Sequence, residues 1–340
     1  MKKKLKVLVL FDGSGPTTID QDFSAEMKTE DWKTEANVME ALRSLGHTAE
    51  HLALFDDLDL LRQKMETFAP DVVFNLVEQF KKNPVFDQNI VSLLEMQGLP
   101  FTGCGAIGLT LCKHKGISKK ILGYHHIHVP HFVVIPRGQR TARLREAKFP
   151  MVVKPVKEEA SYGISRASFV ENDEQFKERV AFIHEKYNSD VIAEEYIEGR
   201  ELYVSLMGNV RLTVFPIREL LFKEVPPNEP KIATYKAKWD EEYRKRWGLT
   251  NQFAEGLDSA LVANIQDTCK RIYRLLTIEG YARIDLRLTA DHKLYFIEAN
   301  PNPHLAADED FAQSAEKAGF RYPQLIDALI RLGMKTARAS

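Results

Sequence analysis

Two segments near the C-terminal end of the chain constrain its fold more than any other part of the sequence. Residues 282–288 (ARIDLRL) and 294–300 (LYFIEAN) both alternate with a period of two, and the short stretch 289–293 between them is turn-like. Successive side chains of a strand point to opposite faces of a sheet. The pattern therefore predicts a β-hairpin, closed by a tight two-residue loop at Asp291 and His292.

With that loop, antiparallel pairing sets Asp285 opposite Glu298 and Arg283 opposite Asn300. Two carboxylates, an amide and a guanidinium group then converge on one patch. Oxygen ligands of this kind suit Mg²⁺, which keeps few protein ligands and takes the others from phosphates and water. Residues 300–303 (NPNP) end the strand abruptly beside this patch. The alternative is an exposed hairpin with a cross-strand charge pair.

Length and composition bound the class of protein. A chain of 340 residues is long enough for two or three packed domains with a substantial core. With 28% charged and 44% hydrophobic residues, the composition is typical of a soluble globular protein. The net charge of −1 gives no general reason to expect a nucleic acid or an anionic membrane as partner.

Residues 1–4 (MKKK) resemble the basic start of a signal peptide, but the apolar run 5–11 contains a lysine and meets Asp12 and Gly13. This run is too short for an export segment and predicts a first buried strand instead. No stretch approaches the roughly 18 apolar residues of a membrane span. The three cysteines are odd in number and show no CxxC spacing, which favours a reduced, cytoplasmic setting.

The first hundred residues predict an α/β domain, because strand and helix patterns alternate along them. Strands are expected over 7–11, 49–54 and 71–76, and helices over 34–45, 58–68 and 88–96. This alternation predicts a small parallel sheet with helices on both faces. The Gly-Ser-Gly pattern after the first strand predicts a turn, since it is too common to indicate a phosphate loop by itself.

The middle of the chain begins with a basic helix, expected over 112–120. Four histidines follow within 125–131 (HHIHVPH) and suggest a metal site. However, no carboxylate or cysteine lies among them, and Pro130 favours a structural connector. Strands are then expected over 132–135 and 151–155.

Two further stretches carry residues suited to binding a nucleotide. Lys154 ends a strand and is followed by a small loop with Ser161 and Gly163, so an ammonium group and backbone amides could surround phosphate oxygens. After a helix expected over 173–187, the segment 191–204 combines strand character with acidic residues and a glycine. It predicts a hinge that offers backbone groups to a base and a carboxylate to ribose. A common strand-end loop and a solvated acidic turn are the alternatives.

The order of these features resembles the ATP-grasp superfamily, and within it most closely the D-alanine–D-alanine ligases. The resemblance covers most of the chain and is carried by these motifs: Phe74–Asn75, 87–98, 99–105 (LPFTGCG), Lys154–Pro155, Ser161–Tyr162–Gly163, Glu194 with Glu201, Arg283–Ile284–Asp285 and Glu298–Ala299–Asn300. It implies an α/β ATP-grasp fold, an α+β composite with an N-terminal Rossmann-like preATP-grasp domain and two α+β lobes that sandwich ATP. The implied domains are 1–103, 104–198 and 199–340, the last carrying the hairpin.

The resemblance also implies which residues bind ATP. Lys115 and Lys154 match the two lysines that hold the phosphates, and Ser161 lies in the loop that closes over them. The residues that match those around adenine and ribose are Glu194, Glu195, Ile197 (through its backbone) and Glu201. Glu195 occupies a position where the ligases often have lysine.

For the metal and the reaction, the resemblance gives Asp285, Glu298 and Asn300 as ligands of Mg²⁺, with two ions expected and Mn²⁺ as a substitute. Arg283 matches the arginine beside the reacting acyl phosphate, and Lys238 the lysine that reaches the γ-phosphate from a mobile loop. In the implied reaction, ATP phosphorylates a carboxylate and an amine then displaces phosphate, which forms an amide or peptide bond. The implied substrates are small amino acids, amines or peptides, and a homodimer is the family expectation.

Several positions depart from the ligase pattern near the substrates. Ala160 and Trp239 stand where the ligases have serine and tyrosine, and Glu26 is the candidate for their glutamate. Further on, Glu309 and Asp310 lie where the ligases take the carboxylate of the second substrate. Because acid repels a carboxylate and attracts an amine, these two residues predict a cationic or carboxylate-poor second substrate.

Three functions follow from these observations. The preferred one is an ATP-dependent carboxylate–amine ligase with a divergent substrate pocket. The second is an authentic D-alanine–D-alanine ligase of peptidoglycan precursor synthesis. The third is a non-catalytic ATP-binding protein, disfavoured because Arg283, a residue needed for catalysis alone, accompanies the binding residues.

Overall fold

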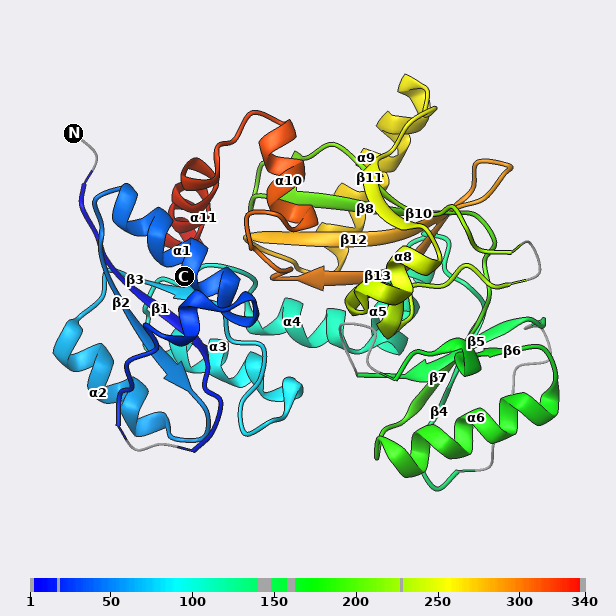
Figure 1. Ribbon diagram of the computed structural model, residues 1–340, viewed down its shortest axis with the longest axis horizontal. Coiled ribbons are helices and arrows are strands. Elements are labelled where there is room, and N and C mark those ends of the chain that lie inside the picture. The colour runs from blue at the N-terminus through cyan, green and yellow to red at the C-terminus, as the bar shows by residue number, and fades with distance from the viewer. Residues whose placement is uncertain (1–2, 17–18, 140–147, 158–162, 227–228, 337–340) are drawn as a thin grey trace.

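The computed structural model describes residues 3–16, 19–139, 148–157, 163–226 and 229–336, without the side chains of 238, 239 and 336. Its strands form three sheets, one parallel and two antiparallel (Figure 1). Over these ranges no helix has both the length and the apolar character that a membrane span requires.

The first sheet is the parallel α/β unit that the sequence predicts. Its strands lie in the order β2-β1-β3, and α1 and α2 pack against opposite faces, because alternate residues of β1 such as Leu8 and Val9 belong to different core clusters. The elements of this region are β1 (Lys6–Asp12), α1 (Lys33–Ser44), β2 (Thr48–Leu54), α2 (Leu58–Phe68), β3 (Val72–Asn75) and α3 (Asp87–Met96). Each predicted element is confirmed, with ends that differ by at most one residue.

The second sheet is antiparallel, with strand order β4-β7-β5-β6. Its elements are β4 (Phe132–Ile135), β5 (Met151–Pro155), β6 (Phe169–Val170), α6 (Asp173–Lys186) and β7 (Val191–Glu195). One face packs on α6 through residues such as Val153 and Ala193. The other face therefore carries Lys154 and Glu194, because side chains alternate along each strand.

The third sheet holds the hairpin. Its main order is β11-β10-β8-β12-β13, with β9 paired to β8. The elements are β8 (Arg200–Met207), β9 (Thr213–Val214), β10 (Arg218–Phe222), β11 (Leu249–Phe253), α9 (Ser259–Leu275), β12 (Tyr281–Leu288) and β13 (Leu294–Pro301). Ile284 and Leu286 face the apolar stripe of α9, so Arg283, Asp285 and Arg287 lie on the opposite face.

The hairpin reaches the predicted pairing by a different route. Arg283 pairs with Asn300 and Asp285 with Glu298, as expected. Beyond Asp285, however, the register shifts by one residue, and Ile297 is the extra residue of a β-bulge in β13. A bulge places two consecutive side chains on one side of a strand, and both Ile297 and Glu298 line the same cavity.

The closing loop was predicted wrongly. Thr289 N–H donates to the carbonyl of Lys293, which leaves three residues in the loop rather than the expected two. The third of them, His292, has φ +60°, a left-handed conformation that ends such a loop. The longer loop and the bulge each shift the register by one residue, and the two shifts cancel.

The basic helix expected over 112–120 is two helices. α4 (Ala106–Lys113) ends before His114, and α5 (Lys115–Tyr124) begins directly after it. The ring of His114 accepts the N–H of Ile117, so this histidine caps α5. Lys115 consequently lies in the first turn of a helix.

The histidine-rich stretch 125–131 is a connector that joins two sheets. The carbonyl of His128 accepts the N–H of Phe296, and that of His131 accepts the N–H of Glu195. The part of the chain that the structure describes contains no group of three His, Cys, Asp or Glu residues suited to a metal ion.

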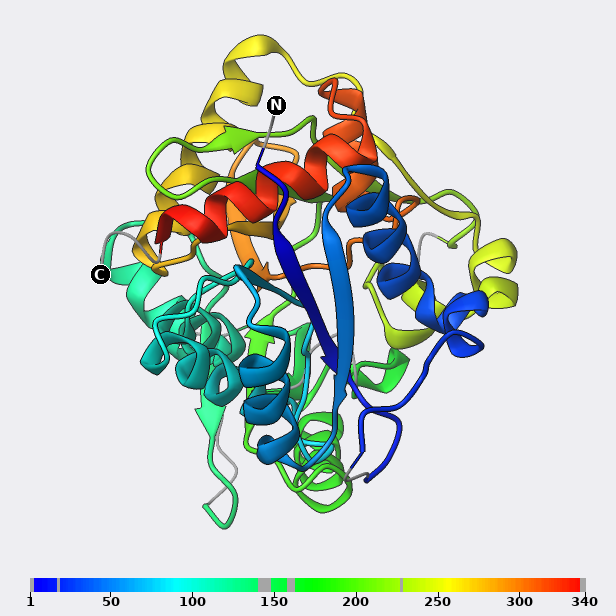
Figure 2. The ribbon, with the colours of Figure 1, turned by 90° about the vertical axis from the view of Figure 1, so that its left-hand side faces the viewer.

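The C-terminal helix returns to the first sheet. α11 (Tyr322–Thr336) lies beside α1, as Figure 1 and Figure 2 both show. Gly333 faces the carbonyl of Phe101 so closely that a Cβ atom would not fit there. The last part of the chain thus supports the N-terminal sheet as well as the third sheet. The remaining helices are α7 (Tyr235–Trp239), α8 (Glu241–Arg246) and α10 (Asp310–Lys317), with single-turn 3₁₀ helices at Glu26–Lys28, Glu30–Trp32, Pro84–Phe86 and Arg166–Ser168.

Candidate active site

A cavity lies between the second and third sheets, where most of the predicted binding residues meet. Its lining from the second sheet and the hinge includes Lys154, Glu194, Glu195 and Ile197. The lining from the third sheet includes Glu201, Asp285, Arg287, Ile297 and Glu298. We refer to it as the intersheet cavity. It brings together residues that are up to 146 positions apart in the sequence, from Val152 to Glu298.

Glu194 forms the buried end of this cavity. Its Oε2 lies 3.1 Å from Nζ of Lys154, and its Oε1 lies 3.5 Å from Nζ of Lys119. Burial by itself raises the pKa of Glu194, but the two ammonium groups outweigh it and hold the pKa below its ordinary value. Oε1 is buried and accepts no hydrogen bond from the described residues, so it could accept one from an amino group of a ligand.

The hinge crosses from β7 to β8 beside Glu194. Glu195 lines the cavity, but one of its carboxylate oxygens accepts the N–H of Lys148 at 2.8 Å. Its own N–H donates to His131. Glu195 is therefore partly occupied by protein contacts, which weakens the predicted adenine role of its side chain. Ile197 lines the cavity as expected.

Glu201 lies on β8 and is paired with an arginine that the sequence analysis did not single out. Nη2 of Arg287 lies 2.6 Å from Oε2 of Glu201, and the hydroxyl of Tyr203 donates to Oε1 at 3.0 Å. Arg287 also donates to the carbonyls of Gly199 and Lys231. The alternation that pointed to Arg283 and Asp285 continues to Arg287, so the signal for this residue was present in the sequence.

At the hairpin end, Asp285 is held by Arg283 and Asn300. Nε of Arg283 donates to Oδ1 at 2.8 Å, and Nη2 donates to Oδ2 at 2.9 Å. Nδ2 of Asn300 donates to Oδ2 at 3.2 Å. From α5, Nζ of Lys115 lies 3.8 Å from Oε2 of Glu298 on β13. Arg283, the three predicted metal ligands and Lys115, one of the predicted phosphate residues, thus form one cluster.

This cluster suits a divalent metal ion by its donor chemistry. Asp285, Glu298 and Asn300 supply carboxylate and amide oxygens from one face of the hairpin. Such hard oxygen donors, few in number, are typical of a magnesium site that shares its ion with phosphates. Arg283 and Lys115 already offset the two carboxylate charges, and a bound cation would take over that role.

Four predicted residues fall where the structure says little or nothing. Ala160 and Ser161 lie outside the described residues. Lys238 and Trp239 end α7, but their side chains are not described. The N–H of Tyr235, the first residue of α7, donates to Ile164 at 3.1 Å, so this helix touches the segment that follows the predicted phosphate loop.

Asp310, predicted to contact a substrate, is paired within the protein. Its carboxylate is buried and accepts hydrogen bonds from Arg218 at 3.1 Å and from Asn251 at 2.6 Å. Its charge is therefore compensated within the protein and does not attract a substrate amine. The neighbouring Asp308 pairs with Lys33, and Glu309 is the half-buried residue that precedes α10.

Glu26 is exposed on a 3₁₀ helix and does not line the cavity nearest to it. That cavity, which we call the acidic cavity, has a volume of about 340 Å³ and lies between the first and third sheets. Four carboxylates contribute to its lining: Asp12, Asp31, Glu35 and Glu78. Other lining residues include Asn75, Gln79, Tyr281 and His304. No lysine or arginine occurs among the lining residues that the structure describes.

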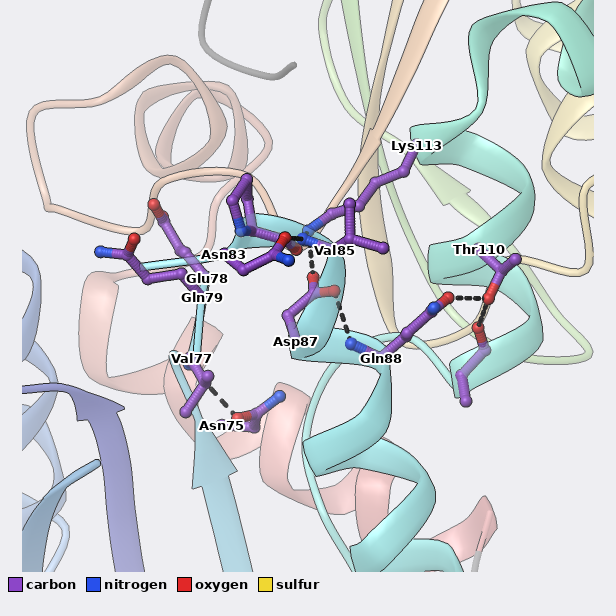
Figure 3. Close-up of polar contacts among 12 residues, drawn as sticks. Asn75, Val77, Glu78, Gln79, Asn83, Val85, Asp87, Gln88, Thr110 and Lys113 are labelled. Atoms are coloured by element: carbon purple, nitrogen blue, oxygen red, sulfur yellow. Dashed lines mark hydrogen bonds and ion pairs between the residues drawn. The ribbon is translucent and has the colours of Figure 1, made fainter. Parts of the chain in front are cut away.

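Among the described residues, no lysine or arginine lines the acidic cavity beside its carboxylates, unlike in the intersheet cavity. Asp12 accepts the N–H groups of Glu78 and Gln79, at 3.1 and 3.2 Å, and Figure 3 shows both residues on the loop after β3. Burial, reinforced by Glu78, raises the pKa of Asp12 to about 7. Burial also raises the pKa of Glu35. Nε2 of His304 lies 3.7 Å from Glu78.

Comparisons with known proteins agree on one family. A family model described as the D-ala D-ala ligase C-terminus matches residues 121–331. An uncharacterised protein of Sinorhizobium fredii, y4sG, is 31% identical over 301 residues, which cover 86% of this chain and 85% of that protein. The D-alanine–D-alanine ligase of Aquifex aeolicus is 28% identical over 298 residues, which cover 88% of this chain and 94% of the ligase.

Two solved structures share the fold at lower sequence identity. The D-alanine–D-alanine ligase of Bacillus anthracis complexed with ATP aligns with a TM-score of 0.75 and 20% identity, over 98% of this chain and 99% of that one. The VanG D-Ala:D-Ser ligase of Enterococcus faecalis aligns with a TM-score of 0.71 and 17% identity, over 97% and 100%. The predicted ATP-grasp fold is thereby confirmed.

Proposed function

The chain belongs to the D-alanine–D-alanine ligase family, and from this premise we propose that it is an ATP-dependent carboxylate–amine ligase. ATP, which the Bacillus anthracis relative holds, is its proposed nucleotide. The proposed domains are residues 1–103, 104–198 and 199–340. A homodimer and a cytoplasmic location also belong to the proposal, and both come from the family alone.

One observation carries the proposal: Asp285 and Glu298 of the hairpin line the same cavity as Glu194 and Lys154. Asp285, Glu298 and Asn300 lie on one face of the hairpin, and Arg283 contacts Asp285 directly. A protein that merely bound a nucleotide would need the buried carboxylate and the lysines. Arg283, beside the proposed metal ligands, adds a permanent cation where a reacting group would carry negative charge.

Chemically, the reaction forms a carbon–nitrogen bond in two steps. A substrate carboxylate oxygen attacks the γ-phosphorus of ATP, and the bond from that phosphorus to ADP breaks. The amine nitrogen of the second substrate then attacks the acyl carbon, the bond to phosphate breaks, and the amine loses a proton. Phosphorylation is needed because a free carboxylate has no leaving group.

The residues of this chain divide the work. Lys115 and Lys154 bind phosphate oxygens as point charges, and Glu194 accepts a hydrogen bond from the base. Asp285, Glu298 and Asn300 would hold a metal ion, which would neutralise charge during phosphoryl transfer. Arg283 stabilises the oxyanion that forms when the amine attacks.

Water must be excluded while the acyl phosphate exists, because acyl phosphates hydrolyse. The candidates for this role are the segment around Ser161, which lies outside the described residues, and the segment that carries Lys238. Backbone contact between Tyr235 and Ile164 supports their meeting over the intersheet cavity.

For the substrates, we propose a molecule with an ammonium group in the acidic cavity. Asp12, Glu35 and Glu78 lie around one space without a lysine or arginine among the described lining residues. An ammonium group would relieve their mutual repulsion. This replaces the sequence-based argument from Glu309 and Asp310, and it keeps the expectation of a cationic substrate.

An ADP-release screen tests the proposal directly. Purified protein with ATP and Mg²⁺ is assayed against amino acids, amines and short peptides, alone and in pairs. We expect ADP release with a pair that includes a basic amino acid or amine, and little with D-alanine alone. Efficient D-alanyl-D-alanine formation would identify an authentic D-alanine–D-alanine ligase, and ATP binding without turnover on any pair would favour a non-catalytic role.

A further inference from the structure

Lys119 is a buried lysine that none of the roles above uses. It lies in the second turn of α5, and its side chain is fully buried. Its Nζ donates to the carbonyl of Ile297 at 2.7 Å and to that of Phe296 at 3.2 Å, and it lies over the ring of Phe296. The same Nζ is 3.5 Å from Oε1 of Glu194.

These contacts join the two ends of the intersheet cavity. Ile297 is the extra residue of the β-bulge, and Glu298, the proposed metal ligand, follows it immediately. Glu194 lies on a different sheet and forms the base-binding end. A single ammonium group therefore holds the backbone of one end and the carboxylate of the other.

Burial of an ammonium group is expensive, which argues against a role as mere filling. Burial lowers the pKa of Lys119 to about 8, opposed by Glu194 and reinforced by Lys154. An apolar side chain of similar length would avoid the loss of hydration. What such a side chain could not do is donate hydrogen bonds to the bulge and balance Glu194 at the same time.

We propose that Lys119 is a positioning residue that couples recognition of the base to placement of the metal ligand Glu298. By fixing the carbonyls of Phe296 and Ile297, it keeps the bulge in the form that turns Glu298 into the cavity. By facing Glu194, it keeps that carboxylate ionised and aimed at the base. The inference rests on the proposed function, since it assumes that the intersheet cavity binds ATP with a metal ion.

The test measures binding, which requires no knowledge of the substrates. Lys119→Met is compared with Lys120→Met, a change of the next, exposed lysine of the same helix. Calorimetry gives the affinity for a non-hydrolysable ATP analogue and for its inosine counterpart, each over a range of Mg²⁺ concentrations. Inosine lacks the amino group from which Glu194 is proposed to accept a hydrogen bond.

In Lys119→Met we expect the preference for the adenine analogue to fall about tenfold and the Mg²⁺ concentration for half-saturation to rise about tenfold, the size of a lost charge-assisted hydrogen bond. Lys120→Met should leave both unchanged. If Lys119 were purely structural, Lys119→Met would lower the melting temperature but change neither the preference for the adenine analogue nor the Mg²⁺ concentration for half-saturation. That result overturns the inference. If Lys119→Met does not fold, Lys119→Gln, which keeps a donor without the charge, takes its place with the same expectations at reduced size.

Failure of the proposed function gives a different result. If the unmodified protein binds neither analogue, the nucleotide site itself is wrong. If it binds the adenine analogue with Mg²⁺ and Lys119→Met matches it in both ratios, then the role of Lys119 alone is rejected.

Discussion

The intersheet cavity and the acidic cavity both collect carboxylates, but they balance the charge in opposite ways. In the intersheet cavity, Glu194 lies 3.1 Å from Lys154, and Glu201 lies 2.6 Å from Arg287. In the acidic cavity, Asp12 and Glu35 face the same space as Glu78, and the described lining includes no lysine or arginine. One cavity is charge-compensated by the protein itself, whereas the other leaves its charge for a ligand.

The pKa values follow this difference. Although burial opposes it, the ammonium groups beside Glu194 keep its pKa below the ordinary value. Burial raises the pKa of Asp12 to about 7 and also raises the pKa of Glu35, and Glu78 adds to both effects. Opposite charges favour the ionised form, and burial without them favours the neutral form. The comparison indicates a preorganised site for a polyanion next to a site that is completed by a cation.

The largest expected effect is at the metal end of the compensated cavity. Glu298→Gln nearly keeps the size of the side chain but removes the charge that lies 3.8 Å from Lys115. We expect ATP-dependent activity to fall by roughly two orders of magnitude or more, because charge neutralisation during phosphoryl transfer is lost. ADP release with the substrates found by the screen measures it. Circular dichroism should show an unchanged fold, and normal turnover would remove Glu298 from the metal site.

Part of this cavity could be predicted from the sequence, since it depends on local alternation. The pattern at Arg283 and Asp285 fixes which side chains share a face, and the structure confirms their partners Asn300 and Glu298. The bulge at Ile297 could not be predicted, because the strand pattern does not mark it and the hydrogen bond to its carbonyl comes from Lys119 on a distant helix. The parallel N-terminal sheet was predictable for the same local reason, while the return of α11 to it was not.

Contacts between residues far apart in the sequence show where sequence reasoning fails. Asp310 was interpreted as a substrate residue because neighbouring acids are visible in the sequence. Its partner Arg218 lies 92 positions away, and the sequence around Asp310 does not indicate that contact. Conversely, Asp12, Glu35 and Glu78 are scattered along the chain, and the folding of the N-terminal α/β unit, in which β1 pairs with β3, brings them to one space.

A smaller effect is expected at the two lysines of the compensated cavity. Lys115→Ala and Lys154→Ala should each weaken ATP binding roughly 10- to 100-fold, the worth of a charge-assisted hydrogen bond to phosphate. Adenosine binding should change less in Lys115→Ala, because Lys115 forms its ion pair with Glu298, whereas Lys154 lies 3.1 Å from Glu194. Calorimetry with both ligands measures this. Unchanged ATP affinity in both variants would contradict a phosphate site here.

In the uncompensated cavity, a change of charge should act on the substrate instead of the nucleotide. Glu35→Gln should raise the KM for the cationic substrate about tenfold and leave the KM for ATP unchanged, since one carboxylate–ammonium contact is lost. Glu40→Gln, at an exposed position on the same helix, is the matched control. A rise in the KM for ATP alone would place Glu35 with the nucleotide and end the contrast between the two cavities.

The last expected effect is on stability instead of activity, a pH dependence that originates at Asp12. Its pKa is about 7 in the folded protein and near 3.8 when unfolded, so the folded state retains a proton that the unfolded state has lost between these values. Stability from this group therefore falls as pH rises from about 4 to about 7 and is constant above that. Asp12→Asn cannot titrate and still accepts the two N–H groups. Its stability relative to the unmodified protein should rise across this window, by on the order of 2 kcal/mol after allowance for partial exposure.

Urea unfolding at several pH values measures this difference, and the cationic substrate sharpens it. A bound ammonium group would favour the ionised form of Asp12, so ligand stabilisation of the unmodified protein should increase from pH 4 to pH 7. In Asp12→Asn this part of the increase should be absent. If the stability of the two proteins responds alike to pH and to the ligand, the charge of Asp12 is compensated by the protein. The acidic cavity would then balance its carboxylate charge as the intersheet cavity does, which contradicts the contrast between them.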